Sequence, residues 1–144
     1  MKAFVCWVII LFFSVGAVET AGANEVLFVG DFDFTIGGKL AIPIIFGPST
    51  DEYYDFAIAK EAVTDGAILN SPNPVFSISF TRGNKVYVCH KKYPECASVQ
   101  IAKSDNRIEF LIDSKLVNPD TEEILESRDV LVIDGENYSK LGLE

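Results

Sequence analysis

Apolar and polar residues alternate one by one through the middle of the chain. In residues 75–81, the apolar side chains of Phe76, Ile78 and Phe80 alternate with hydroxyl side chains. A period of two is typical of a strand that buries one face and leaves the other in water. The same kind of pattern returns three more times, in residues 85–89, 98–101 and 107–112. Short turn segments separate the runs, so the pattern predicts four strands in an antiparallel meander.

The residues before this meander give weaker strand signals. Residues 25–36 contain two short runs of this kind, and a glycine pair then predicts a hairpin turn into residues 39–46. That last run is apolar on both faces, which indicates a central strand, but it contains Pro43. Because proline has no N–H to donate to a ladder, we expect the strand to be broken or bulged there.

Residues 49–66 fit two different structures. They begin with the spacing of a helix capping box, Ser49-Thr-Asp-Glu52, and end with Asp65-Gly66, which can stop a helix or turn a hairpin. The apolar residues between them fall near one helical face, which favours a helix. Residues 54–58 also alternate as a strand would, so the strand stays open as the alternative.

The predicted fold class is mainly β with a minor α component. We expect an antiparallel β-sandwich or barrel with one or two short helices and one hairpin-loop disulfide. The second helix is expected over residues 121–127, capped by Asp120 and followed by a strand over residues 129–133. No internal repeat or linker divides residues 24–144, so they are expected to form a single domain.

The first 23 residues have the layout of a secretory signal peptide. Lys2 precedes an apolar run over residues 3–18, and the small residues of Ala21-Gly22-Ala23 offer a cleavage site. The apolar run is shorter than the roughly 20 residues that span a bilayer. We therefore expect cleavage after Ala23, no stable membrane span in the processed chain, and a secreted or periplasmic protein.

Two cysteines remain once the expected leader, which carries Cys6, is removed. In an oxidising compartment the pair Cys89 and Cys96 predicts one disulfide. The ring would close a short loop over residues 90–95. A loop that is already ordered loses less entropy when it enters a partner's cleft.

Three side chains of this loop form the predicted binding site: Lys91, Lys92 and Tyr93. Tyrosine offers a large contact area with few rotatable bonds to freeze, and the lysines are a basic island on an acidic chain. The alternative is that the two lysines only keep a hairpin tip soluble and protect a sheet edge.

The chain is strongly acidic, with a formal net charge of −9. Nucleic-acid binding depends on Lys and Arg meeting phosphates, so we expect no nucleic-acid partner. A cationic protein partner, a bound cation or simple solubility fits the charge. The oligomeric state is left open by the sequence.

Signals for catalysis and for metal binding are weak. His90 is the single histidine, and it lies beside an expected disulfide cysteine with two lysines next to it. A nucleophilic triad would have to use it, and a zinc site with Cys89 and Cys96 has poor ligand spacing. Asp31 with Asp33, and Asp134-Gly-Glu136, are the candidates for a hard cation, but neither segment completes an EF-hand loop. We expect no cofactor, no structural metal and no enzymatic activity.

A small binding protein is therefore the predicted function. Its most concrete form is a protein-binding role as an enzyme inhibitor, immunity factor or recognition module. The alternative is a small-ligand carrier whose barrel encloses an apolar molecule among Phe76, Phe80 and Phe110. A carboxylate-based hydrolase ranks third, and a subunit of a surface assembly also stays open. Asn137-Tyr138-Ser139 is an acceptor triplet for glycosylation.

Overall fold

Strands form most of the computed structural model, which describes residues 19–21, 25–30 and 32–143. The first layer contains β2 (Glu25–Val29), β3 (Thr35–Ile36), β4 (Lys39–Gly47), β5 (Glu52–Ala59), β7 (Phe76–Arg82) and β8 (Lys85–Val88). The second layer contains β1 (Glu19–Ala21), β6 (Ile68–Asn70), β9 (Ala97–Ser104), β10 (Arg107–Val117) and β11 (Ile124–Asp134). The described residues also form two short helices, the 3-10 helix η1 (Lys60–Ala62) and the α-helix α2 (Gly135–Lys140).

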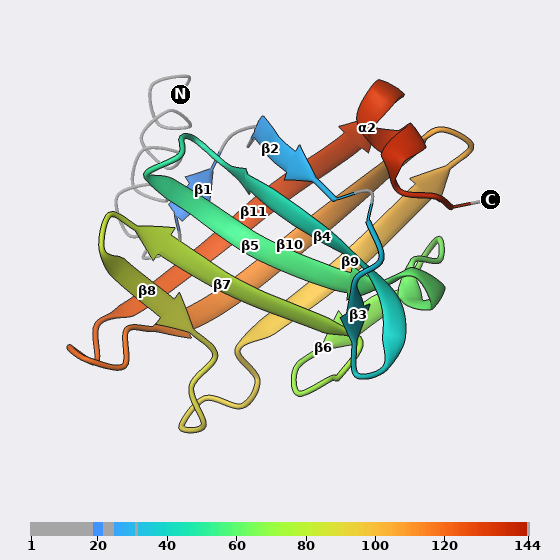
Figure 1. Ribbon diagram of the computed structural model, residues 1–144. Coiled ribbons are helices and arrows are strands. Elements are labelled where there is room, and N and C mark those ends of the chain that lie inside the picture. The colour runs from blue at the N-terminus through green and yellow to red at the C-terminus, as the bar shows by residue number, and fades with distance from the viewer. Residues whose placement is uncertain (1–18, 22–24, 31, 144) are drawn as a thin grey trace, which may run out of the picture.

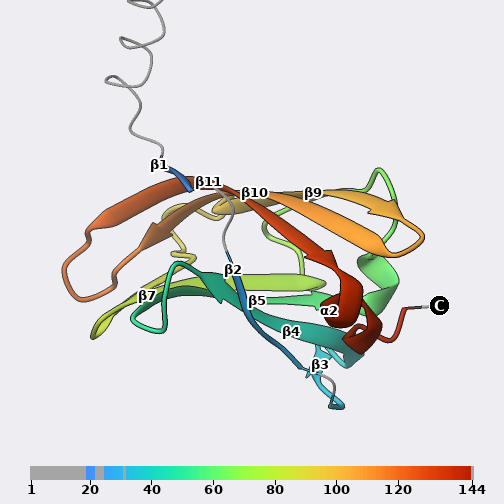
Figure 2. The same cartoon turned by 90° about the horizontal axis from the view of Figure 1, so that it is seen from above.

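One curled sheet makes both layers. Its strand order is β1-β11-β10-β8-β7-β5-β4-β2. Off this path, β9 pairs with β10, and β6 pairs with β9, which extends the second layer. The sheet folds back on itself so that the two layers face each other, and β2 passes across their open side (Figure 2). Except for β1 on β11, the pairings are antiparallel. The predicted fold class is confirmed as an antiparallel β fold curled into a half-barrel.

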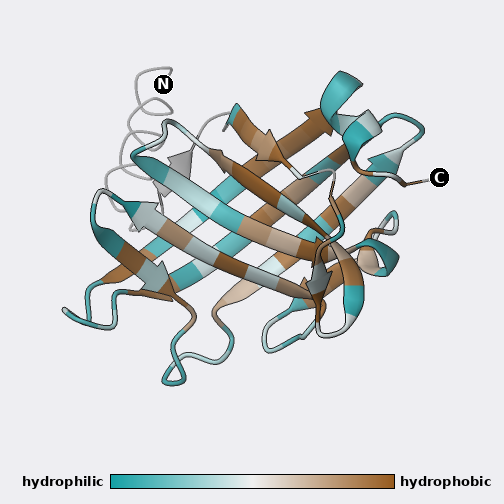
Figure 3. Ribbon diagram, viewed as in Figure 1, coloured by the Kyte–Doolittle hydropathy of each residue, from teal (hydrophilic) through white to brown (hydrophobic). Residues whose placement is uncertain are grey.

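The core lies between the two layers. Strand β7 carries apolar bands that alternate with more polar ones (Figure 3), because every second side chain of a strand points to the same face. The inward side chains of the predicted strand over residues 75–81, Phe76, Ile78 and Phe80, are all buried in the core. Across the core, the rings of Phe56 in β5 and Phe110 in β10 meet edge to face with centroids 5.4 Å apart. Contacts of this kind hold the layers together.

The predicted four-strand meander is wrong at its centre. Strands β7 and β8 pair with each other, and so do β9 and β10. Strand β8, however, does not pair with β9; it meets β10 at Val88 and Val117 instead. Between β8 and β9 the chain therefore crosses from one layer to the other, and the loop between the two cysteines makes the crossing.

The predicted helix over residues 49–66 is wrong, and the strand alternative is confirmed. Strand β5 pairs with β4 on one side and β7 on the other. The Ser49 hydroxyl accepts hydrogen bonds from the N–H groups of Asp51 and Glu52, both at 3.2 Å, so the expected cap serves a turn before a strand. Only η1 is helical in this segment, and Asp65-Gly66 forms the turn before β6.

Strand β4 runs unbroken through Pro43, which corrects the expected break. Pro43 lies opposite Ala57 of β5, and its carbonyl accepts a hydrogen bond from the N–H of Gly30 at 2.9 Å. The nitrogen and carbonyl of one strand residue point to the same side, so the proline nitrogen faces the chain just past β2 rather than β5. The irregularity lies in β2 instead, where the register shifts between Val26 and Phe28.

The second predicted helix, over residues 121–127, is also wrong. Strand β11 already begins at Ile124, and the residues before it form a tight turn. In this turn the side-chain carbonyl of Asn118 accepts hydrogen bonds from the N–H groups of Asp120 and Thr121. Asn118 therefore supplies the cap that Asp120 was expected to supply, and it closes a turn, not a helix. The α-helix of the described chain is α2, after β11.

Most of the expected signal peptide, residues 1–18 together with 22 and 23, lies outside the described residues. Within it, β1 is described, and it runs parallel to Ser127–Asp129 of β11. Among the described residues, no helix has the length and apolar character needed to span a membrane.

Candidate functional site

The predicted disulfide between Cys89 and Cys96 is confirmed. It joins the end of β8 in one layer to the start of β9 in the other, with the Cα atoms 5.4 Å apart. Cys89 is exposed, whereas Cys96 is buried and belongs to the core. The loop over residues 90–95 is thus fixed at both ends, and one end is fixed to the hydrophobic core.

The three predicted binding residues have different environments in this loop. Lys91 is exposed and has no ion-pair partner among the described residues. Lys92 donates a hydrogen bond from Nζ to Oε1 of Glu122 at 3.0 Å, which raises the pKa of Lys92 and lowers the pKa of Glu122. Tyr93 is half-buried, and the Nζ of Lys115 lies 4.2 Å from the centre of its ring. Lys91 is therefore the lysine of the pair that faces solvent without an oppositely charged partner among the described residues, while Tyr93 packs the loop against Lys115 of β10.

His90 is tied into the backbone of the same loop. Its carbonyl accepts a hydrogen bond from the N–H of Tyr93 at 2.8 Å, and its Nδ1 accepts one from the N–H of Lys92 at 3.1 Å. Cys89, next to it in the chain, is bonded to Cys96, so neither cysteine can serve as a thiolate nucleophile or as a zinc ligand. The geometry assigns His90 a role in shaping the turn.

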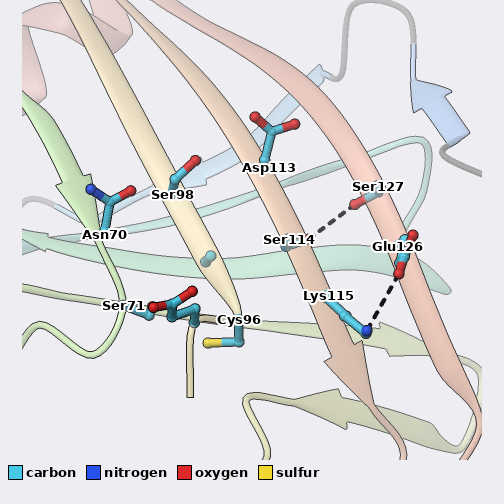
Figure 4. A pocket seen from close by; sticks show the side chains of 11 residues that line it. Asn70, Ser71, Cys96, Ser98, Asp113, Ser114, Lys115, Glu126 and Ser127 are labelled. Atoms are coloured by element: carbon cyan, nitrogen blue, oxygen red, sulfur yellow. Dashed lines mark hydrogen bonds and ion pairs between the residues drawn. The ribbon is translucent and has the colours of Figure 1, made fainter. Parts of the chain in front are cut away.

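A polar hollow of about 590 Å³ lies on one side of the loop, over the second layer (Figure 4). Strand register forms its floor. Across four neighbouring strands, one row of opposite residues runs from Asn70 through Ser98 and Asp113 to Arg128. Asn70, Ser98 and Asp113 line the hollow, and Glu95 borders it from the loop. Side chains in such a row share one face of a sheet.

Asp113, Lys115 and Glu126 of the polar hollow each have an ion-pair partner. Nε of Arg128 lies 2.7 Å from Oδ1 of Asp113, and this hydrogen bond raises the pKa of Arg128. Nζ of Lys115 lies 3.7 Å from Oε1 of Glu126 while it also contacts the ring of Tyr93. Lys115 thereby connects the loop to the floor of the hollow.

A second hollow, of about 420 Å³, lies on the other side of the loop. It separates the loop from the segment that enters β7, and apolar residues such as Pro72, Phe76, Ile78 and Pro94 line it together with His90. The two hollows share Ser71 and Cys96 in their walls. The disulfide-closed loop is therefore a ridge with a polar hollow on one side and a more apolar hollow on the other.

A buried polar network below the polar hollow was missed by the sequence analysis. The hydroxyls of Tyr54 and Ser127 lie 2.5 Å apart, and those of Ser127 and Ser114 lie 3.0 Å apart. Tyr54 belongs to β5 and the two serines to β11 and β10, so the network links the two layers. Ser114 follows Ile108, Phe110 and Ile112 at a spacing of two, and this inward position was the available signal.

Beside the loop, the phenol of Tyr87 donates a hydrogen bond to the carboxylate of Glu123. This bond raises the pKa of the buried Tyr87, burial adds to the rise, and the same bond lowers the pKa of Glu123. The pKa of a tyrosine in the unfolded chain is about 10. When folding raises that pKa, the protonated phenol stabilises the folded state fully below about pH 10, and this contribution is lost as the pH rises further.

We therefore expect Tyr87→Phe to flatten the alkaline loss of stability. Above pH 10 the melting temperature of the parent chain should fall more steeply than that of the variant, because only the parent loses the protonated phenol. Melting curves between pH 8 and 11 measure the difference. Parallel profiles would show that Tyr87 does not couple folding to pH.

The remaining predicted positions are scattered over the fold. Asp31 lies outside the described residues, and Asp33, Asp134 and Glu136 are exposed. The described residues contain no group of three side chains placed to hold a metal ion. Asn137 is half-buried in α2, where the Ser139 hydroxyl donates a hydrogen bond to the carbonyl of Gly135 at 3.4 Å.

The phenylalanines considered for a ligand cavity, Phe76, Phe80 and Phe110, are buried in the core. The ring of Phe80 contacts those of Tyr54 and Tyr87 at centroid distances of 4.7 and 6.0 Å. These rings fill space between the layers.

Comparison with known proteins identifies no relative: no family model, no curated protein and no solved structure matches this chain.

Proposed function

We propose that this protein is a secreted or periplasmic binding module that recognises another protein through the loop over residues 90–95. The observation that carries the proposal is the loop's construction, a ridge tied to the core through Cys96 and flanked by two hollows. An enzyme inhibitor, an immunity factor or a recognition domain would all use such a loop.

Pre-organisation is the physical reason why this loop suits recognition. The disulfide and the backbone hydrogen bonds at His90 already hold its shape, so binding loses little further loop entropy. Tyr93 packs against Lys115 and gives the ridge a rigid side. Lys91 extends from it into water and offers a cation to a partner carboxylate.

The hollows give the partner places for its own side chains. The polar hollow offers hydroxyl, amide and carboxylate groups, and the second hollow offers proline and phenylalanine surfaces. The surrounding chain has a net charge of −9, so a cationic partner would approach faster than a neutral one, and salt would weaken this steering. The expected leader and the disulfide both suit an encounter in an oxidising compartment.

A small-ligand carrier has less support. That function needs a cavity between the layers, but Phe80 and Phe110 pack into the core, and Phe76, also part of the core, lines the second hollow at the surface. The hollows that flank the loop open on the surface instead, where a protein partner can reach them.

The proposal predicts that Lys91→Ala with Lys92→Ala weakens partner capture by about tenfold, or about 1.4 kcal/mol, while the melting curve stays nearly unchanged. The immobilised protein is incubated with its native medium, and the proteins that it retains are eluted with rising salt and identified by mass spectrometry. Lys140→Ala in α2, at the far end of the fold from the loop (Figure 1), is the matched control and should capture the partner as the parent does. Equal capture by the double variant would refute recognition through the loop.

A further inference from the structure

One edge of β11 is covered by a segment that leader cleavage would remove. Strand β1 runs parallel to β11, with Glu19 opposite Ser127 and Ala21 opposite Asp129. On its other edge, β11 pairs with β10 along its whole length. The expected cleavage point follows Ala23, so processing would take β1 away together with the leader.

Removal of β1 would expose the backbone groups that now face it. In the part of the chain that the structure describes, β1 is the strand that pairs with this edge of β11. Strand β2 passes nearby, but its ladder partner is β4. The ladder between β10 and β11 has no register shift, so no bulge turns the edge away. A regular open edge pairs readily with another extended chain.

We propose that the edge of β11 at Ser127–Asp129 accepts an extended segment of a partner protein, added parallel to β11 in the place that β1 occupies. The proposal rests on leader cleavage after Ala23 and is independent of recognition by the loop. Main-chain hydrogen bonds would hold the segment, as in other cases of strand addition.

A separate chain fits this place better than a second copy. Two copies related by a two-fold axis would bring their β11 edges together in antiparallel orientation. The register that β1 shows is parallel. Ser127 and Asp129 are buried at this edge, whereas Arg128 is exposed. The incoming segment should therefore place a polar residue opposite the exposed Arg128, as β1 does with Thr20.

Amide hydrogen exchange tests the proposal. We compare the unprocessed chain, refolded with its disulfide formed, with the processed chain collected after export. The probe is a peptide of residues 17–23, which contains the β1 sequence. A second peptide, methylated at the amide nitrogens of Thr20 and Ala21, keeps the side chains but loses backbone donors.

Exchange at Ser127–Asp129 should be at least tenfold faster in the processed chain, and the unmodified peptide should slow it again. The methylated peptide should not. Equal exchange in both chains, equal protection by both peptides, or a processed chain that still carries Glu19–Ala21 would overturn the proposal. Protection that rises with protein concentration would assign the edge to a second copy and would also overturn it. Lys91→Ala with Lys92→Ala should leave the peptide effect unchanged, which separates this test from that of the loop.

Discussion

Replacing Phe110 with alanine is expected to lower the free energy of unfolding by about 3–5 kcal/mol. Phe110 is fully buried on β10, and its ring meets that of Phe56 from the opposite layer. The substitution would remove apolar surface from the core and leave a cavity where the two layers touch. A domain of this size has a total stability of about 5–15 kcal/mol, so the loss would be a large part of it.

Denaturant unfolding followed by far-ultraviolet circular dichroism measures this loss, and Phe28→Ala is the matched control. Phe28 is the same residue type on β2, but 44% of it is exposed. Its truncation should cost less than about 1 kcal/mol, because much of its surface is already in water. Phe110→Leu keeps most of the volume and provides a measurable protein if the alanine variant fails to fold. Similar losses at positions 28 and 110 would contradict the assignment of Phe110 to the inter-layer core.

The strands with strict alternation could be predicted from the sequence because burial on one face leaves a period of two. Phe76, Ile78 and Phe80 point into the core, as their spacing predicts. In β5 the signal was blurred, since Ala57 and Ala59 on the other face are also buried. The second half of β5 therefore has no alternation of apolar and polar residues, and its apolar residues also fit one side of a helix.

The helix over residues 49–66 was predicted from a cap at Ser49 and the helix over residues 121–127 from a cap at Asp120, and in both places polar side chains close a turn instead. Ser49 and Asn118 bind backbone N–H groups two and three residues later, and this chemistry closes a turn as well as it caps a helix. Whether such a cap begins a helix or closes a turn depends on the structure that the following segment adopts. After Ser49 and after Asn118, the chain joins a sheet whose other strands are distant in sequence, and no local pattern contains that information.

The candidate site could be predicted only in part. The sequence alone predicts the disulfide and the loop, because two cysteines in an oxidising compartment have one partner each. The hollows depend on register between strands far apart in sequence, such as Ser98 opposite Asp113. The different environments of Lys91 and Lys92 depend on the position of Glu122, thirty residues away. Contacts between residues so far apart in sequence are set by the complete fold, and no local sequence pattern predicts them.

The second large effect is expected from removal of the disulfide. Cys89→Ser with Cys96→Ala should lower the free energy of unfolding by about 2.5 kcal/mol, because the unfolded chain regains the entropy that the small ring removes. Serine suits the exposed position of Cys89, and alanine suits the buried position of Cys96. Reduction of the parent protein should shift its denaturant midpoint in the same direction. An unchanged midpoint after confirmed reduction would show that the bridge does not constrain the unfolded chain.

The same double variant separates the two roles of the disulfide. If the bridge only stabilises the fold, partner capture below the melting transition should match that of the parent. If it also pre-organises the loop, capture should fall about tenfold while the variant is still fully folded, because the partner must then order residues 90–95 itself. Tyr93→Phe keeps the ring that packs against Lys115 and serves as the control with an intact ridge. If the variant without the bridge captures the partner as fully as the parent does, the disulfide only stabilises the fold. The proposal that a rigid loop is needed for recognition would then be refuted.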